Sequence, residues 1–227
     1  MAEQSNKIIV YSTHTPNGFV VPLYLHELQL AYPEKNIEYE YVKLSISDAD
    51  IGKVHNQVKS PWFLEINPNG RIPAITHNGR RVFETSAILY YLSHVFDTEH
   101  KFYASPESNL DAWTEEQSWI YFVHGGIGPM QGQANHFNLF AKEKIPYAIN
   151  RYLNETHRLY SVVEEQLGKH KYIAGDTLSI VDFKLAGWAM IATRTGLNVE
   201  SLPRTIAWLK GLQDRQAWKD AEKETKG

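Results

Sequence analysis

Residues 67–88, "NPNGRIPAITHNGRRVFETSAI", decide the fold. Inside this stretch Asn78-Gly79 separates two short apolar runs, and the pair is the strongest short-range signal for a hairpin because both central turn residues must adopt positive φ. We therefore predict antiparallel strands over residues 72–76 and 81–83. Thr85 then opens a helix over residues 86–96, whose apolar side chains recur at helical spacing.

Strand and helix patterns alternate through the residues that precede this hairpin. The apolar run at residues 7–12 predicts a strand, and residues 18–30 predict a helix. Residues 36–44, "NIEYEYVKL", alternate apolar and charged side chains with a period near two, as a half-buried strand does. A shorter helix is predicted at residues 48–57. The complete order is βαβ-α-ββα.

The second half of the chain carries only helical periodicity, for example over residues 109–122 and 146–167. Ser179 and Asp182 form a Ser-x-x-Asp capping box at the start of a further helix. We therefore predict an α/β domain over residues 1–97, a linker over residues 98–107 and an all-helical domain over residues 108–227.

Composition excludes several classes of function. The 227 residues have a net charge of −3, which gives no electrostatic footprint for nucleic acid. The longest apolar run, residues 185–192, is shorter than the roughly 20 residues that span a bilayer, and no signal-peptide pattern occurs, so we expect a cytoplasmic protein without a membrane partner. There is no cysteine, so any thiol chemistry must be supplied by a ligand.

Two stretches match known functional motifs only in part. His26-Glu27 begins like a zinc-protease helix, but Leu30 occupies the position of the second histidine, and we expect no metal. Residues 125–132, "GGIGPMQG", are rich in glycine, but Gln131 replaces the last glycine of a dinucleotide fingerprint. We interpret this stretch as a break or kink in a long helix.

Two places within residues 67–88 favour a peptide ligand. Pro73 cannot donate to a β-ladder, so Ile72-Pro73 at the head of a strand indicates an open backbone edge, where a cis bond is a fair expectation and where Ile72 can hold an extended peptide. Glu84 and Thr85 stand at a helix start, which attracts a carboxylate, while Glu84 can hold a cation. The pair suits an amino acid head group; the alternative is a simple N-cap with an acidic neighbour.

A small peptide with an amino acid head, an amide middle and a reactive group near the first helix fits these sites, and glutathione has this structure. The element order, with "NPNGRIPAI" and "ETSAI", resembles the glutathione S-transferase family over essentially the whole chain. "PNGFVV", "GPMQGQANHF" and "IPYAINRYLNETHRLY" further resemble the fungal nitrogen-regulator-like class and the bacterial nu class. The resemblance implies a thioredoxin-like first domain, glutathione as co-substrate, a homodimer, and a helical domain that lines the second-substrate pocket.

The resemblance assigns the contact with the glutathione sulfur to Asn17, in the Pro-Asn-Gly turn before the first helix. A carboxamide cannot act as a base near neutral pH, but its NH2 group can donate to a thiolate. The sequence alone favours a simple turn or N-cap role for Asn17, and the resemblance reverses this preference. Thr15, Ser12 and Tyr11 are rivals for the contact, and Thr15 is the strongest because it lies in the same turn.

Other site residues follow from the resemblance more loosely. Lys59, or Gln57 beside it, lies where related proteins bind the glycine carboxylate. His136 and Gln133, polar residues beside the predicted helix break, are candidates for the second-substrate pocket, although side chains at such spacing also form cores. Arg151 is placed to reach a glutathione carboxylate, in the same chain or across a dimer.

The leading hypothesis is an enzyme that activates the glutathione thiolate for attack on a small apolar electrophile, a peroxide or a disulfide. The second hypothesis is a sensor of glutathione or glutathione disulfide, or a regulatory protein. The nitrogen regulator of yeast carries a long Asn/Gln-rich extension before this fold, whereas six residues precede the first strand here, which favours the enzyme. A third hypothesis is a carrier of apolar ligands.

Overall fold

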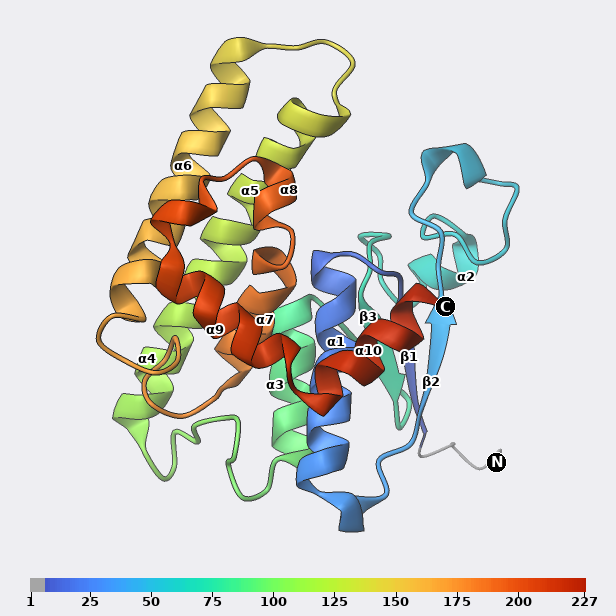
Figure 1. Cartoon of the computed structure of the whole chain (residues 1–227). Coiled ribbons are helices and arrows are strands. Elements are labelled where there is room, and N and C mark those ends of the chain that lie inside the picture. The colour runs from blue at the N-terminus through green and yellow to red at the C-terminus, as the bar shows by residue number, and fades with distance from the viewer. Residues whose placement is uncertain (1–6) are drawn as a thin grey trace. The chain divides into compact units, whose positions relative to one another are not determined.

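The computed structural model describes residues 7–227, which divide into two compact units. The first unit contains residues 7–98 together with Gln216–Gly227, and the second contains Glu99–Arg215 (Figure 1). The structure differs here from the domain boundaries drawn above, because the last helix belongs to the first unit. This helix, α10 (Gln216–Lys226), buries one face against α1 (Pro16–Ala31). Helical periodicity identifies such a face but does not identify its partner.

The first unit contains a four-stranded mixed sheet in the order β2-β1-β3-β4. β1 (Ile8–Ser12) is parallel to β2 (Tyr39–Lys43) and antiparallel to β3 (Ala74–His77). β3 and β4 (Arg80–Phe83) form the predicted hairpin, and the turn residues Asn78 and Gly79 have φ values of 52° and 72°. The hairpin prediction is therefore confirmed, together with the thioredoxin-like fold of the first unit.

Three helices besides α10 belong to this unit: α1, α2 (Pro61–Leu64) and α3 (Thr85–Phe96). The helix predicted at residues 48–57 is wrong. Only a 3-10 turn, Asp48–Asp50, forms there, and Gly52 has a φ of 72°, which ends helical geometry. Further along the chain the backbone is not helical, and Gln57 forms a β-bridge with Ser45 beyond the end of β2.

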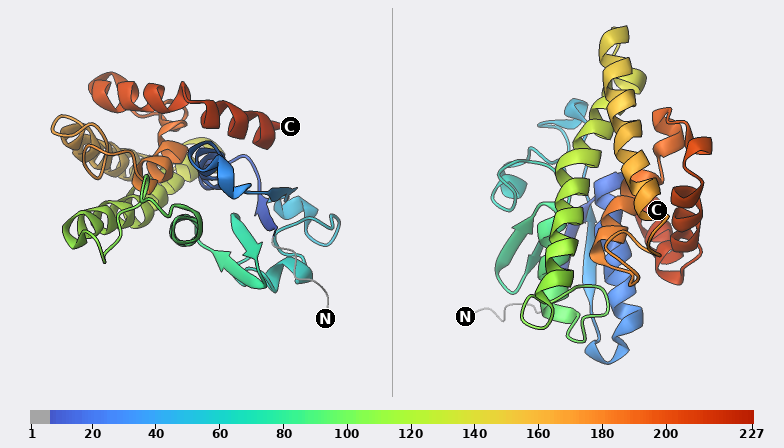
Figure 2. Two further views of the ribbon diagram at one scale, coloured as in Figure 1. Left: turned by 90° about the horizontal axis from the view of Figure 1, so that it is seen from below. Right: turned by 90° about the vertical axis from the view of Figure 1, so that its left-hand side faces the viewer.

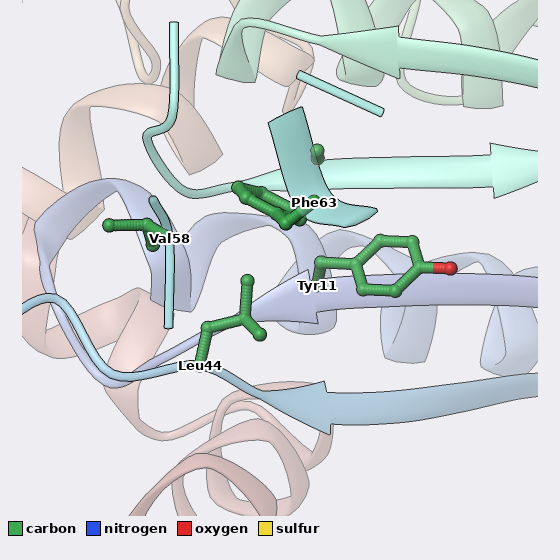
Figure 3. Packing of buried hydrophobic residues seen from close by; sticks show 5 residues of the cluster. Tyr11, Leu44, Val58 and Phe63 are labelled. Carbon is green, nitrogen blue, oxygen red and sulfur yellow. The ribbon is translucent and has the colours of Figure 1, made fainter. Parts of the chain in front are cut away.

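The sheet has buried side chains on both faces. Figure 3 shows one face, where Tyr11, Leu44, Val58 and Phe63 pack with Ala74 and hold α2 against the sheet. Neighbouring side chains alternate across a strand, so the residues next to Tyr11 and Ala74, which are fully buried, point to the other face. α1 and α3 cover that face (Figure 2), and a 2.6 Å hydrogen bond between the hydroxyls of Tyr24 and Ser93 joins the two helices.

The second unit is helical. Its α-helices are α4 (Leu110–Tyr121), α5 (Gly128–Asn135), α6 (Pro146–Gln166), α7 (Ile180–Ala189), α8 (Ala192–Thr195) and α9 (Pro203–Gln213). Ser179 caps α7, and the predicted capping box with Asp182 is present. In the described part of the chain, no helix combines the length and the apolarity that a membrane span needs.

A π-helical segment, Phe122–Ile127, lies between α4 and α5 and overlaps the start of the glycine-rich stretch. The backbone stays helical at Gly128, so the predicted break is a change in hydrogen-bond spacing. Gln131 is fully buried: its amide NH2 donates to Trp188 O and Thr195 Oγ1, both at 3.0 Å, and its carbonyl accepts from Tyr160 Oη at 2.8 Å. The residue that departs from the dinucleotide fingerprint is thus a core polar group, satisfied by its neighbours.

Candidate functional site

The sheet topology brings the predicted sites of the first unit to one end of the sheet. The parallel strands β1 and β2 end there, β4 also ends there, and β3 begins there with Ala74, which pairs with Tyr11 and Phe83. The turn after β1, the Ile72-Pro73 dipeptide before β3 and the start of α3 therefore leave the sheet at the same end. The segment that carries Lys59 reaches this end through the bridge beyond β2.

Thr15 caps α1, and Asn17 lies in its first turn. Thr15 Oγ1 accepts a 3.1 Å hydrogen bond from the Gly18 N–H, so its hydroxyl hydrogen can still be donated. Asn17 is half-buried and is the second residue of the helix, which begins at Pro16. The positive end of the helix dipole and the N–H groups of this turn give the surroundings of Asn17 a positive potential.

Ser12, the last residue of β1, replaces a hydrogen-bond donor that Pro22 lacks. Pro22 lies inside α1 and lacks the N–H that would bond the carbonyl of Gly18, four residues earlier. Ser12 supplies the missing donor, because its Oγ donates to Gly18 O at 3.0 Å and its side chain is fully buried. Pro22 is the seventh residue of α1, so it lies beyond the first four positions, whose N–H groups have no partner within the helix.

The four residues considered for the sulfur contact differ in their contacts and burial. Ser12 is committed to the Gly18 carbonyl, and the Tyr11 hydroxyl lies 3.4 Å from Thr76 Oγ1 while its ring packs against the ring of Phe63. Both side chains are buried. Thr15 and Asn17 are the two of the four that lie at the helix start.

The peptide bond between Ile72 and Pro73 is cis, as expected. Both ladders of β3 stop at Ala74, so neither extends to Ile72. The preceding turn is held by the buried Asn67, whose Nδ2 donates to Arg71 O at 2.7 Å, and by Lys59, whose Nζ donates to Asn69 O at 2.9 Å. Lys59 thus lies beside the Ile72-Pro73 segment with an exposed side chain.

Glu84 stands at the N-cap position of α3 with a φ of 72° and a ψ of 122°. A residue other than glycine in this region costs about 1–3 kcal/mol, and such strain occurs mainly at functional sites. The side chain of Glu84 does not cap its own helix and is exposed, whereas Thr85, the first helical residue, is 3% exposed. An exposed carboxylate therefore stands beside the N–H groups of the first helical turn.

His136 and Arg151 lie in the second unit. His136 begins a π-helical segment, His136–Phe140, and its exposed ring meets Phe137 edge-on with centroids 4.9 Å apart. Arg151 is an exposed residue of α6 and lines a groove of about 440 Å³ with Tyr147, Asn150, Asn154, Glu155 and Arg158.

Sequence reasoning missed a contact behind the β1–α1 turn. His14, one residue before the cap of α1, lies 2.8 Å through Nδ1 from Thr225 Oγ1 on α10. The two residues are more than 200 positions apart, and no local pattern connects them. Within residues 7–227, no group of three or more His, Asp or Glu side chains is arranged to hold a metal ion.

Family models match both units. The N-terminal domain of glutathione S-transferase matches residues 16–94, and the C-terminal domain of glutathione S-transferase matches residues 135–215. The chain belongs to the glutathione S-transferase family. A curated member of this family, the disulfide-bond oxidoreductase YfcG of Escherichia coli, is 34% identical, and the match covers 92% of each chain. The resemblance drawn from the sequence motifs is thus confirmed.

Two solved structures of the glutathione S-transferase family are similar along nearly the whole chain. A glutathione transferase homologue from Lodderomyces elongisporus, with two glutathione molecules per subunit, is 33% identical with a TM-score of 0.83, covering 96% of this chain and 98% of the other. The glutathione transferase URE2P6 of Phanerochaete chrysosporium, in complex with oxidized glutathione, is 31% identical with a TM-score of 0.85, covering 98% and 97%.

Proposed function

We propose that this chain is a glutathione transferase that binds glutathione at the end of the sheet and stabilises its thiolate through Asn17. The observation that carries the proposal is the position of Asn17 in the first turn of α1, at the sheet end where Ile72 and Glu84 also lie. Similar proteins crystallised with glutathione or oxidized glutathione support the choice of ligand.

Asn17 acts as a hydrogen-bond donor. Its Nδ2 group donates to the sulfur once the proton has left, so it stabilises the thiolate without taking the proton itself. Each pKa unit by which the thiol is acidified requires about 1.4 kcal/mol of preferential binding of the thiolate. A hydrogen bond to a charged group contributes about 1.5–3 kcal/mol, and the dipole of α1 adds to it. Thr15 has a hydroxyl hydrogen left for a second, weaker contact.

The remaining sites hold the peptide. Ile72 offers its N–H and C=O beyond the last β3 pair, so the cysteinyl part of glutathione aligns with it like an added strand. The γ-glutamyl head group places its carboxylate at the N-terminus of α3, near Thr85, and its ammonium at the Glu84 carboxylate. Lys59 pairs with the glycine carboxylate.

The activated thiolate is the nucleophile of the reaction. With an apolar electrophile it forms a thioether, while a leaving group departs with its electron pair or an activated double bond takes up the pair and a proton. With a disulfide it forms a new S–S bond while the other sulfur leaves as a thiolate. The chain has no cysteine, so no mixed disulfide can form on the enzyme, and disulfide exchange takes place between bound glutathione and its substrate. The relatedness to YfcG favours the disulfide reaction. In the second unit, we assign His136 to the second-substrate pocket and Arg151 to a glutathione carboxylate in a homodimer.

The test is a titration of the thiolate absorbance of glutathione with pH, on the wild type, on Asn17→Ala and on Asn17→Asp. We expect a depressed thiol pKa with the wild type and its loss in both variants. Asn17→Asp is the sharper variant because it keeps the shape and replaces the donor by a negative charge, which raises the pKa of the bound thiol. The Asn17→Asp variant should still fold, because an acidic residue in the first turn stabilises the helix. A change in its thiol pKa would therefore not result from unfolding.

An unchanged thiol pKa of bound glutathione in either variant would remove Asn17 from this role. Saturable glutathione binding without a depressed thiol pKa in the wild type would support a glutathione sensor or regulator instead. Loss of glutathione binding with retained binding of apolar compounds would support a carrier.

A further inference from the structure

The contact between His14 and Thr225 has a defined direction. Thr225 is 1% exposed, and its Oγ1 lies 2.7 Å from Ala221 O, to which it donates, as well as 2.8 Å from His14 Nδ1. A hydroxyl has one hydrogen, so Thr225 must accept the second bond. His14 therefore carries its hydrogen on Nδ1 and donates it to α10.

Aromatic packing supports this contact on the side of α1. The ring of His14 meets the fully buried Phe19 edge-on at 5.9 Å, and Phe19 meets Trp218 of α10 edge-on at 4.7 Å. Trp218 and Thr225 lie on the same face of α10, two turns apart. Figure 1 shows α10 crossing α1, against which it packs in the first unit.

A separate contact holds α10 to the sheet. The Tyr39 hydroxyl donates to Glu224 Oε2, and His26 Nε2 lies 3.4 Å from the same oxygen. Neither Tyr39 nor His26 belongs to the β1–α1 turn. The docking of α10 and its bond to the turn can therefore be altered independently, which makes a matched control possible.

The turn of residues 13–16 is otherwise anchored from its own neighbourhood, by Ser12 to Gly18 O and by Gly18 N to Thr15. His14 adds the anchor that comes from another element. It lies between the end of β1 and the residues assigned above to the thiolate, so a shift of His14 is transmitted to Thr15 through one peptide unit and to Asn17 through three.

We propose that His14 is a positioning residue, whose Nδ1 hydrogen bond to Thr225 fixes the turn so that Asn17 meets the glutathione sulfur. The C-terminal helix is then part of the catalytic unit although it contributes no group to the substrate. This proposal rests on the function proposed for Asn17. Imidazole keeps the Nδ1 hydrogen in its neutral and its charged form, so the bond to Thr225 does not depend on protonation of the ring.

The experiment compares Thr225→Val, Thr225→Ser and Tyr39→Phe. Thr225→Val keeps the shape and removes the acceptor, and we expect the thiol pKa of bound glutathione to rise toward that of free glutathione. Turnover falls about tenfold or more while KM for glutathione changes little, because the loss is in orientation. Thr225→Ser restores the acceptor and wild-type values. Tyr39→Phe loosens α10 elsewhere and leaves the thiol pKa unchanged.

The outcomes separate this proposal from the function on which it rests. If Asn17→Ala abolishes the thiol pKa depression but Thr225→Val retains it, the positioning role is refuted and the proposed function stands. If the wild type shows no depression, both fail. An equal effect of Tyr39→Phe and Thr225→Val would also refute the positioning role, because docking of α10 alone would explain it. Should Thr225→Val not fold, His14→Phe removes the donor while keeping the ring against Phe19, and the same criteria apply.

Discussion

Gly18→Ala should disable the site without changing any residue assigned to glutathione. A Cβ on Gly18 would lie 1.9 Å from Thr13 O and 2.7 Å from Ser12 Oγ, and Cβ contacts under 3.0 Å essentially never occur. Thr13 O is backbone, so the turn itself must move. The required opening is about 1 Å, a misplacement that costs about 100-fold in rate when it affects a reacting group. Overpacking adds about 1–3 kcal/mol of destabilisation.

The assay is kcat/KM with glutathione, together with the free energy of unfolding in urea. Gly211→Ala is the matched control, because Gly211 is an exposed residue within α9 and a Cβ there meets no atom within 4 Å. That variant should keep full activity and gain about 1 kcal/mol of stability. A Gly18→Ala protein with wild-type kcat/KM and stability would refute the reasoning, since the turn would then tolerate the movement that the structure forbids.

Three further predictions follow from single contacts. Glu84→Gly should raise the free energy of unfolding by about 1 kcal/mol, because glycine adopts a φ of 72° without strain, and should weaken glutathione binding about tenfold or more in calorimetry; unaltered affinity would refute the head-group assignment. Asp182→Ala should cost about 3 kcal/mol or more in urea unfolding, because Ser179 N, Ile173 N and Trp208 Nε1 lose their acceptor; a loss under 1 kcal/mol would contradict this. Burial lowers the pKa of His14, as do the nearby Lys226 and Lys43, while Glu222 acts in the opposite direction. The unfolded chain therefore binds the proton more readily, and the free energy of unfolding rises with pH up to about 6.5. His14→Phe should flatten this slope.

Local signals predicted the first unit because its decisive features lie close together in the sequence. The Asn-Gly turn requires positive φ at two adjacent residues, and the structure has it. The predicted helix at residues 48–57 failed because a weak helical pattern competed with a long-range bridge from Ser45 to Gln57. The placement of α10 failed for a related reason: a buried helix face is visible in the sequence, but α1 as its partner is not.

In the candidate site, too, local sequence patterns predicted some features, whereas contacts between distant residues could not be predicted. Thr15, Asn17, Ile72 and Glu84 were predicted from turns and helix starts, and the sheet topology brings their segments to one end. Ser12 was weighed as a rival for the sulfur contact, whereas its hydroxyl compensates for the N–H that Pro22 lacks. A donor that replaces a missing N–H can come from any neighbouring element, so proline alone does not reveal it.

The Asn17 carboxamide does not titrate, so the thiolate stabilisation proposed for it depends on the geometry of one hydrogen bond. A charged group that stabilises the thiolate can retain part of its effect when misplaced, because its charge acts over several ångströms, whereas the hydrogen bond proposed for Asn17 weakens steeply with angle and distance. The anchors of the turn reflect this requirement: Ser12, Thr15 and His14 each make a hydrogen bond that fixes it, and Gly18 leaves no space for a side chain. Substitutions at these positions should therefore reduce turnover more than glutathione affinity, because the peptide contacts proposed for Ile72 and Glu84 lie on other segments.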